Sequence, residues 1–134
     1  MNNTVIFTRK VNFYETDAQG IVHHSNYPRY FEEARGFFLE KYGFPYYRVR
    51  EDLGVDIVLL KLDVEYKKPL FYGDICFIHI TLSSMDRYFF TFEYKVYKDN
   101  ELVTAGFTKH CCIDRSSRRM VSIPDQIKNL FKDG

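Results

Sequence analysis

Apolar and polar residues alternate with a period of two over most of this chain. The alternation is clearest in residues 5–13, 57–66, 76–82 and 90–96. It predicts strands that bury one face and expose the other to solvent. Residues 101–114 have a strand-like composition, but their pattern does not indicate which face is buried. The chain is therefore expected to form at least five strands.

The side chains expected on the buried strand faces are apolar, and Arg9 alone interrupts the pattern of the first strand. Strand by strand, they are Val5, Phe7, Val11 and Phe13; Val58, Leu60, Leu62, Val64 and Tyr66; Cys76, Ile78, Ile80 and Leu82; and Phe90, Phe92, Tyr94 and Val96.

A helical period replaces the alternation between residues 27 and 42. Apolar side chains recur there at steps of three and four, with charged side chains on the opposite side, which predicts an amphipathic helix. Asn26 can cap its start, Pro28 fits the first turn, where a missing N–H is tolerated, and Gly43 can end it. Its apolar side consists of Tyr27, Tyr30, Phe31, Ala34, Phe37, Phe38 and Tyr42.

The remaining segments are predicted to connect these elements. Residues 46–54 are polar and are expected to form a loop or short turn. Residues 67–74 contain Pro and Gly and predict a turn, and Asp99-Asn100 suits a two-residue hairpin turn. Residues 122–124 are expected to start a short C-terminal helix whose apolar side is Ile127, Leu130 and Phe131.

Short connections favour antiparallel pairing, so the predicted class is α+β, with the long helix packed on one face of the sheet. The 134 residues suggest a single domain spanning 1–134. A helix of about 16 residues is about 24 Å long, and covering its large side chains requires a wide sheet. Because such a sheet keeps an exposed edge, an oligomer is expected.

The composition is that of a globular protein, with 46% hydrophobic residues and a formal net charge of +1. This balance predicts no long-range attraction to nucleic acid or to a membrane surface. The first residues lack the basic region of a signal peptide, and no stretch has the length of a membrane span. Three cysteines without metal-ligand spacing favour a reduced, cytoplasmic setting.

The segment between the first strand and the long helix carries the candidate chemistry. Asp17 lies on a loop that leads into the helix start, where backbone N–H groups lack partners. A carboxylate beside such donors suits attack on a polarised carbonyl. Asp17 can equally serve only to stabilise the helix start. For His24, a role in polarising the substrate and a role in packing remain open, and a metal site formed with His23 is disfavoured because adjacent histidines rarely bind one ion.

Residues 14–26, with the pattern D-x-x-G-x-V-x-H-x-N, and the following Tyr30-Phe31-Glu32-Glu33-Ala34-Arg35 resemble the hotdog-fold acyl-CoA thioesterases of the 4-hydroxybenzoyl-CoA thioesterase/YbgC type. The resemblance covers nearly the whole chain, and Tyr66-Lys67-Lys68-Pro69 matches a weaker sequence feature that recurs in proteins of this fold. It implies a hotdog fold, in which an antiparallel sheet wraps around one long central helix. It also implies a homodimer or a dimer of dimers, with active sites at the subunit interface.

The resemblance implies that Asp17 is the catalytic carboxylate and that His24 supplies a backbone N–H to the thioester carbonyl. Two positions depart from the family pattern, because Phe13 and His23 stand where tyrosine is frequent. The residues expected to contact the substrate are Phe13, Gly20, Val22, His23 and Asn26.

The predicted reaction is hydrolysis of an acyl-CoA thioester to a free acid and CoA, with no metal and no cofactor. One alternative is hydrolysis of acyl groups on acyl carrier protein, for which Arg115, Arg118 and Arg119 form the only obvious basic rim. These arginines could also hold CoA phosphates or simply be solvated. A non-catalytic acyl-CoA-binding module is a second alternative. A hydratase is disfavoured because it relies on a different His and Asp arrangement.

Overall fold

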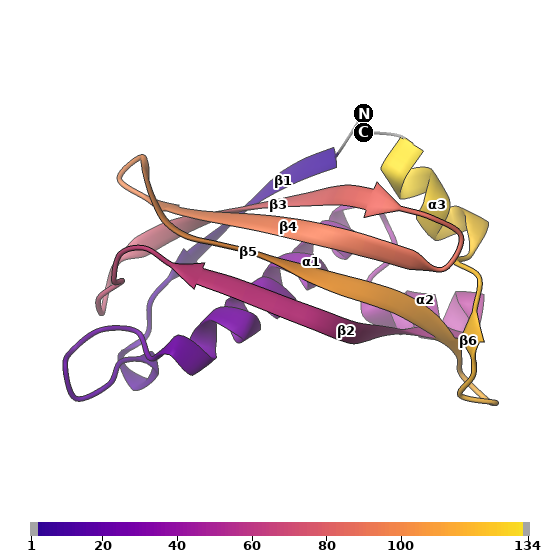
Figure 1. The fold of residues 1–134 in the computed structure, drawn as a ribbon, viewed down its shortest axis with the longest axis horizontal. Helices are drawn as coiled ribbons and strands as arrows, with labels where there is room; N and C mark the ends of the chain where they lie inside the picture. The colour runs from indigo at the N-terminus through magenta and orange to yellow at the C-terminus, as the bar shows by residue number, and fades with distance from the viewer. Residues whose placement is uncertain (1–2, 133–134) are drawn as a thin grey trace.

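The computed structural model describes residues 3–132, and in this part of the chain a six-stranded antiparallel sheet carries three α-helices (Figure 1). Two short 3-10 turns, η1 (Phe13–Glu15) and η2 (His24–Asn26), lie between the first strand and the first helix. The other elements, in chain order, are β1 (Asn3–Lys10), α1 (Tyr27–Lys41), α2 (Tyr46–Leu53), β2 (Val55–Tyr66), β3 (Ile75–Met85), β4 (Phe89–Lys98), β5 (Glu101–Asp114), β6 (Met120–Val121) and α3 (Asp125–Lys132).

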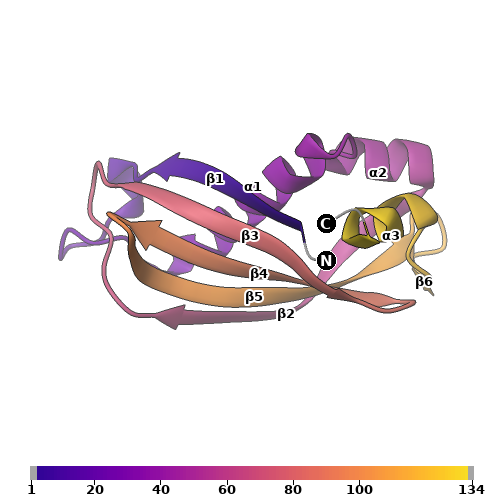
Figure 2. The ribbon, with the colours of Figure 1, turned by 90° about the horizontal axis from the view of Figure 1, so that it is seen from above.

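The strand order in the sheet is β1-β3-β4-β5-β2, with β6 added to β5, and every pairing is antiparallel. Seen from above, α1 and α2 lie on one side of the curved sheet (Figure 2). The predicted α+β class is confirmed. The hairpin at Asp99-Asn100 is also confirmed, since both residues have positive φ angles, 51° and 64°.

The core lies between α1 and the central strands. Phe31 of α1 stacks on Tyr94 of β4 with ring centroids 4.0 Å apart. Gly106 of β5 makes room for this contact, because a Cβ there would lie 2.8 Å from the Phe31 ring and 2.3 Å from the Asp63 carbonyl oxygen. The predicted inward faces of β3 and β4 are buried along their whole length.

The first strand begins and ends earlier along the chain than predicted. β1 ends at Lys10, and Phe13, which begins the turn η1, is 73% exposed. Phe13 is therefore not on the buried face, although Val5 and Val11 are. Arg9 keeps the alternation, since its side chain faces inward and forms an ion pair with Glu15.

A β-bulge between Leu59 and Lys61 corrects the predicted face of β2. Leu59 pairs with His110 and Leu62 with Thr108, and both partners are buried on the helix side of β5. Directly paired residues share a face, so the inward set changes at the bulge. Val58, which pairs with Cys111, therefore does not share the face of Leu62 and Val64, and Leu60 is the unpaired residue at the bulge.

Residues 46–54 were expected to form a loop, but Tyr46–Leu53 is the helix α2. Val49 is its only fully buried side chain, so the apolar period that reveals a helix is missing. Polar contacts support it instead, because Arg48 forms an ion pair with Asp52 and donates to the Gly43 carbonyl. Gly54, with φ 69°, ends it.

The three cysteines are free and buried. Burial raises the pKa of the Cys76 thiol to about 11 and that of Cys112 to about 12. Burial also raises the pKa of Cys111. All three thiols are therefore protonated at neutral pH and poorly reactive.

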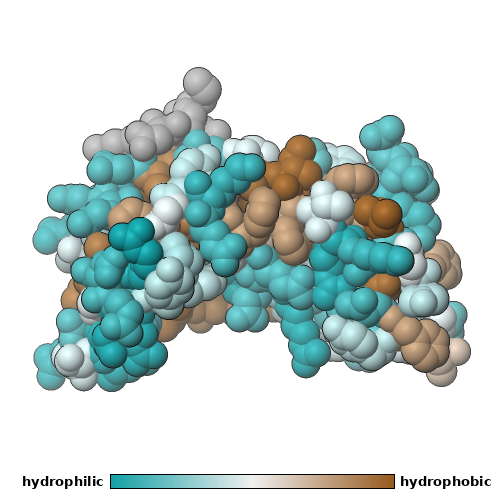
Figure 3. Space-filling view, turned by 180° about the vertical axis from the view of Figure 1, so that it is seen from behind, coloured by the Kyte–Doolittle hydropathy of each residue, from teal (hydrophilic) through white to brown (hydrophobic). Residues whose placement is uncertain are grey.

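The side of the molecule opposite the view of Figure 1 is largely hydrophilic, with separate apolar patches (Figure 3). The outward residues of α1, among them Arg29, Glu32, Glu33 and Glu40, are exposed.

Within residues 3–132, no helix combines the length and apolar character required to cross a membrane.

Candidate active site at the start of the long helix

Glu15 anchors the segment that leads from β1 to α1. Its side chain is 3% exposed and accepts hydrogen bonds from both terminal nitrogens of Arg9 at 2.6 Å and from the Tyr30 hydroxyl at 2.9 Å. The backbone N–H of Asn12 donates to it at 2.8 Å. Burial by itself would raise the pKa of Glu15, but these hydrogen bonds outweigh burial and hold the pKa below its usual value.

The backbone of Glu15 is tied to the helix start as well. Its carbonyl accepts from the His23 N–H and from the Asn26 side-chain amide, both at 2.9 Å. One buried residue therefore links β1, η1 and the first turn of α1. The loop between these anchor points is held in place at both ends.

Gly20 lets this loop close into a tight turn. It has φ 81°, which only glycine adopts without strain, and its N–H donates to the Asp17 carbonyl. The Asp17 N–H donates to the Ile21 carbonyl at 2.8 Å. An isolated antiparallel bridge between Thr16 and Val22 closes the loop, so Asp17 lies on a short loop held by hydrogen bonds.

The chain enters α1 through η2, which leaves one amide unpaired. The Ser25 N–H donates to the His23 ring, the Asn26 N–H to the His23 carbonyl and the Tyr27 N–H to the His24 carbonyl. Within residues 3–132, the His24 N–H has no hydrogen-bond acceptor. It is a free donor at the positive end of the helix dipole.

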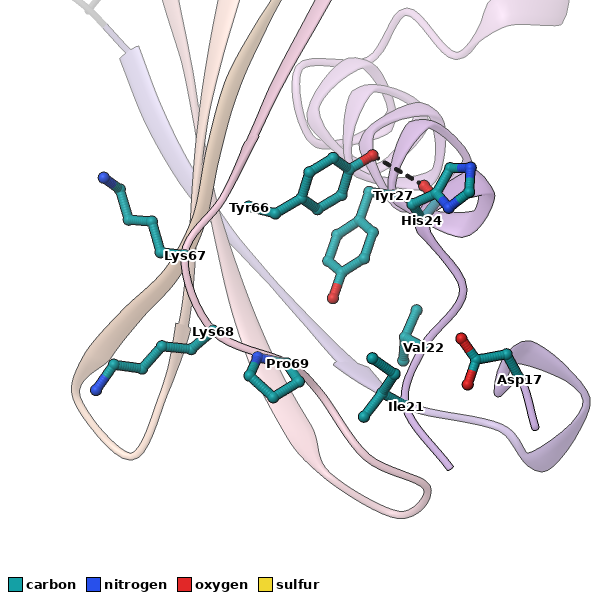
Figure 4. Close-up of a pocket in the computed structure, with 9 residues that line it drawn as sticks. All are labelled: Asp17, Ile21, Val22, His24, Tyr27, Tyr66, Lys67, Lys68 and Pro69. Atoms are coloured by element: carbon teal, nitrogen blue, oxygen red, sulfur yellow. Dashed lines mark hydrogen bonds between the residues drawn. The ribbon is translucent and has the colours of Figure 1, made fainter. Parts of the chain in front are cut away.

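Asp17 and His24 line the same surface hollow, which has a volume of about 390 Å³ (Figure 4). The Tyr66 hydroxyl donates to the His24 carbonyl at 3.1 Å and so joins β2 to the helix start. Figure 4 shows the Lys67 and Lys68 side chains extending away from the other residues. The complete lining is Asp17, Ile21, Val22, His24, Tyr27, Tyr66, Lys67, Lys68 and Pro69.

The carboxylate of Asp17 is half-buried and has no ion-pair partner among the described residues. Its Oδ1 accepts from the Gln19 N–H at 2.8 Å. The nearby lysines pair elsewhere, Lys67 with Glu65 and Lys68 with Glu101. Asp17 therefore offers a carboxyl group without a cationic partner, beside a free backbone donor, an arrangement suited to acyl transfer.

The other residues predicted to contact a substrate have varied positions. Val22 is buried and lines the hollow. Phe13 packs edge-on against Tyr72, outside the lining, and His23 turns its Nδ1 to Ser25. Asn26 is buried but does not cap α1, because its amide donates to Glu15 instead.

Several residues of the site did not emerge as site residues from the sequence. Tyr66 and Pro69 belong to the segment 66–69 that matched the family pattern, which was the available signal. Tyr27 was assigned to the core. Glu33, in the segment 30–35 that also matched the family pattern, lies outside the hollow and forms an ion pair with Arg9 at 2.9 Å.

The basic segment 115–119 lies at the other end of β2 from this hollow. Asp114 pairs with Val55, whereas Tyr66 pairs with Thr104. Arg118 forms an ion pair with Asp56 at 2.6 Å. Within one protomer, this segment does not reach the hollow.

Comparison with known proteins decides the family. The sequence model of the Thioesterase-like superfamily matches residues 11–131, which is most of the chain. The chain belongs to the thioesterase-like superfamily. This membership confirms the predicted resemblance, the hotdog fold and the class of thioester hydrolase.

Individual relatives of this thioesterase align with it over most of their length. The crystal structure of a hypothetical protein from Aquifex aeolicus is 51% identical, with a TM-score of 0.90 and coverage of 95% of this chain and 98% of that one. A 1,4-dihydroxy-2-naphthoyl-CoA hydrolase of Synechococcus sp. is 30% identical, covering 90% of this chain and 84% of its own. The acyl-CoA thioesterase YbgC of Haemophilus influenzae is 24% identical, covering 98% and 96%.

Proposed function

We propose that this thioesterase hydrolyses an acyl-CoA thioester to a free acid and CoA, with Asp17 as the catalytic carboxylate. The observation that carries the proposal is that an unpaired carboxylate and the free His24 N–H line one hollow at the start of α1. Relatives named for CoA thioesters support the substrate class.

The geometry supports a simple division of tasks. The thioester carbonyl oxygen accepts from the His24 N–H, which stabilises negative charge as the tetrahedral intermediate forms. If the Asp17 carboxylate attacks the carbonyl carbon, the C–S bond breaks, the thiolate of CoA leaves, and water then hydrolyses the acyl–Asp17 anhydride to the free acid. If Asp17 instead orients a water molecule, the water oxygen adds to the carbonyl carbon, the C–S bond breaks, and the proton of the water passes to the departing thiolate. Ile21, Val22 and Tyr27 offer the acyl group an apolar wall.

We also propose that the enzyme is a homodimer formed through β2. This strand of 12 residues is an edge of the sheet and exposes Leu59, Leu60 and Leu62. A long apolar edge strand favours pairing with a second chain. Antiparallel pairing of two β2 strands would place the open side of the hollow, at Tyr66, against the partner.

Replacement of Asp17 tests the assignment directly. Asp17→Asn keeps the size and the hydrogen bond from Gln19 but removes the charge, so kcat for acyl-CoA hydrolysis is expected to fall by about 10²-fold or more. The measurement is CoA release across a panel of aliphatic and aromatic acyl-CoAs, with folding checked by circular dichroism. Asp52→Asn, on the exposed face of α2, is the control and should keep full activity. Unchanged turnover in Asp17→Asn would refute the proposal.

A further inference from the structure

Arg35 is a buried cation without an anionic partner. Its side chain lies on the inward face of α1 and is 8% exposed. Nε donates to the Tyr46 hydroxyl and Nη1 to the Tyr94 hydroxyl, each at 3.2 Å. Tyrosine hydroxyls are uncharged at neutral pH. No carboxylate lies within 4 Å of the guanidinium among residues 3–132.

This arrangement is costly for a purely structural residue. A mostly buried charge without an opposite charge loses part of its hydration, which neutral hydroxyls recover only in part. Nη2 of Arg35 has no hydrogen-bond acceptor among the described residues. The guanidinium therefore keeps one edge available to an acceptor from outside the chain.

That acceptor has a place to bind. Arg35 lines a second hollow of about 380 Å³, distinct from the one at Asp17. Its walls combine the apolar Ile57 and Leu59 with Tyr46 and His110, and the exposed Glu32 lies at its rim. The buried His110 is neutral, because burial and the charge of Arg35 lower its pKa to about 3. It therefore adds no competing positive charge.

We propose that this second hollow is a binding site for a carboxylate attached to a small apolar body, with Arg35 as the anion-binding residue. The fork of the guanidinium suits a planar carboxylate better than a single hydroxyl does. The apolar walls hold the rest of the ligand. Tyr46 and Tyr94 hold the guanidinium in position from two different elements.

Binding can be measured without turnover, so the result is independent of the proposed hydrolysis. Benzoate is titrated into the uniformly ¹⁵N-labelled wild-type protein while the Arg35 Nε–H signal is followed, and benzamide serves as the neutral isostere. Benzoate is expected to shift this signal in a saturable manner and to bind at least about tenfold more tightly than benzamide. Equal affinity, or no shift at Arg35, overturns the proposal.

Two substitutions separate binding from a structural role of Arg35. Arg35→Lys keeps the positive charge but loses the fork, and benzoate affinity is expected to fall about tenfold.

Glu32→Gln removes the carboxylate that competes at the rim, so affinity for benzoate is expected to rise severalfold. Glu32 is exposed, so this variant leaves the fold intact. Glu40→Gln, exposed farther along the same helix, is the matched control. A Glu32→Gln protein that binds benzoate no better than Glu40→Gln contradicts the site.

The carboxylate can belong to a free acid or to the acyl group of a substrate in the partner protomer. Kinetics with glutaryl-CoA and pentanoyl-CoA, which differ in a terminal carboxylate, distinguish the sources. If kcat/KM for glutaryl-CoA rises in Glu32→Gln while that for pentanoyl-CoA does not, the acyl group is the ligand. If benzoate binds as described but Glu32→Gln leaves kcat/KM unchanged for both glutaryl-CoA and pentanoyl-CoA, the ligand is a free acid.

Discussion

His24 offers its backbone and its side chain to the candidate site, and the two contributions can be separated by substitution. The preceding residue, His23, has φ −66° and ψ 137°, which is the extended conformation that a following proline requires. His24→Pro would therefore remove the free N–H without forcing the backbone to change. His24→Ala would remove only the imidazole.

We expect His24→Pro to lower kcat by about 10² to 10³, as the loss of one oxyanion donor typically does. His24→Ala is expected to retain most of the activity. Both variants are compared with wild type by steady-state acyl-CoA hydrolysis at equal folded concentration. If the alanine variant loses as much activity as the proline variant, the imidazole and not the amide is the important group.

At the scale of single residues, the sequence identified residues that line the candidate site but not the residue that holds them in position. Asp17, Val22 and His24 were identified from one local motif and line one hollow. Glu15 was not identified, because a glutamate in a turn is normally solvated. Its importance comes from Arg9 and Tyr30, which lie 6 and 15 residues away along the chain. A local pattern does not report such contacts.

Among the elements, β1, η1 and α1 are held together through Glu15, so its charge is expected to matter for stability. Glu15→Gln keeps the size but leaves Arg9 with only Glu33 as a charged partner. We expect the free energy of unfolding to fall by about 2 kcal/mol at pH 7. Urea denaturation measures this loss. Glu101→Gln, in an exposed pair with Lys68, should cost less than about 1 kcal/mol.

The Glu15 effect should also depend on pH. The folded-state pKa lies below that of the unfolded chain, where glutamate titrates at about 4.3. The ion pair therefore stabilises the fold fully above that pH, and this contribution is lost as the pH falls through the folded-state pKa. The difference between wild type and Glu15→Gln should shrink in acid. A constant difference from pH 7 down to pH 3 contradicts this account.

The predicted strands and the long helix were largely correct, because periodicity is strong where one face is buried. The helix α2 was missed because polar contacts, not an apolar stripe, stabilise it. The bulge in β2 was missed because one unpaired residue changes the inward face without changing composition. The order of strands in the sheet depends on pairings between distant segments, such as β2 with β5, which no local pattern encodes.

For the whole molecule, the proposed dimer makes assembly and activity interdependent. Leu60, at the bulge of the edge strand β2, is 51% exposed. Leu60→Lys places a charge on the edge, which disfavours strand pairing. We expect light scattering to show a dimer for wild type and a monomer for the variant, with lower activity per chain. Met120→Lys, on β6, is the control and should remain dimeric. A wild-type monomer that is fully active contradicts the proposed interface.

The buried cysteines have a practical consequence for studying this enzyme. Free CoA is commonly detected with Ellman's reagent, which reacts with accessible thiolates. Since the protein's own three thiols are enclosed and protonated, the native enzyme should contribute almost no background colour. When no substrate is present, the same reagent would then report unfolding of the protein, because three cysteine thiols per chain would become accessible.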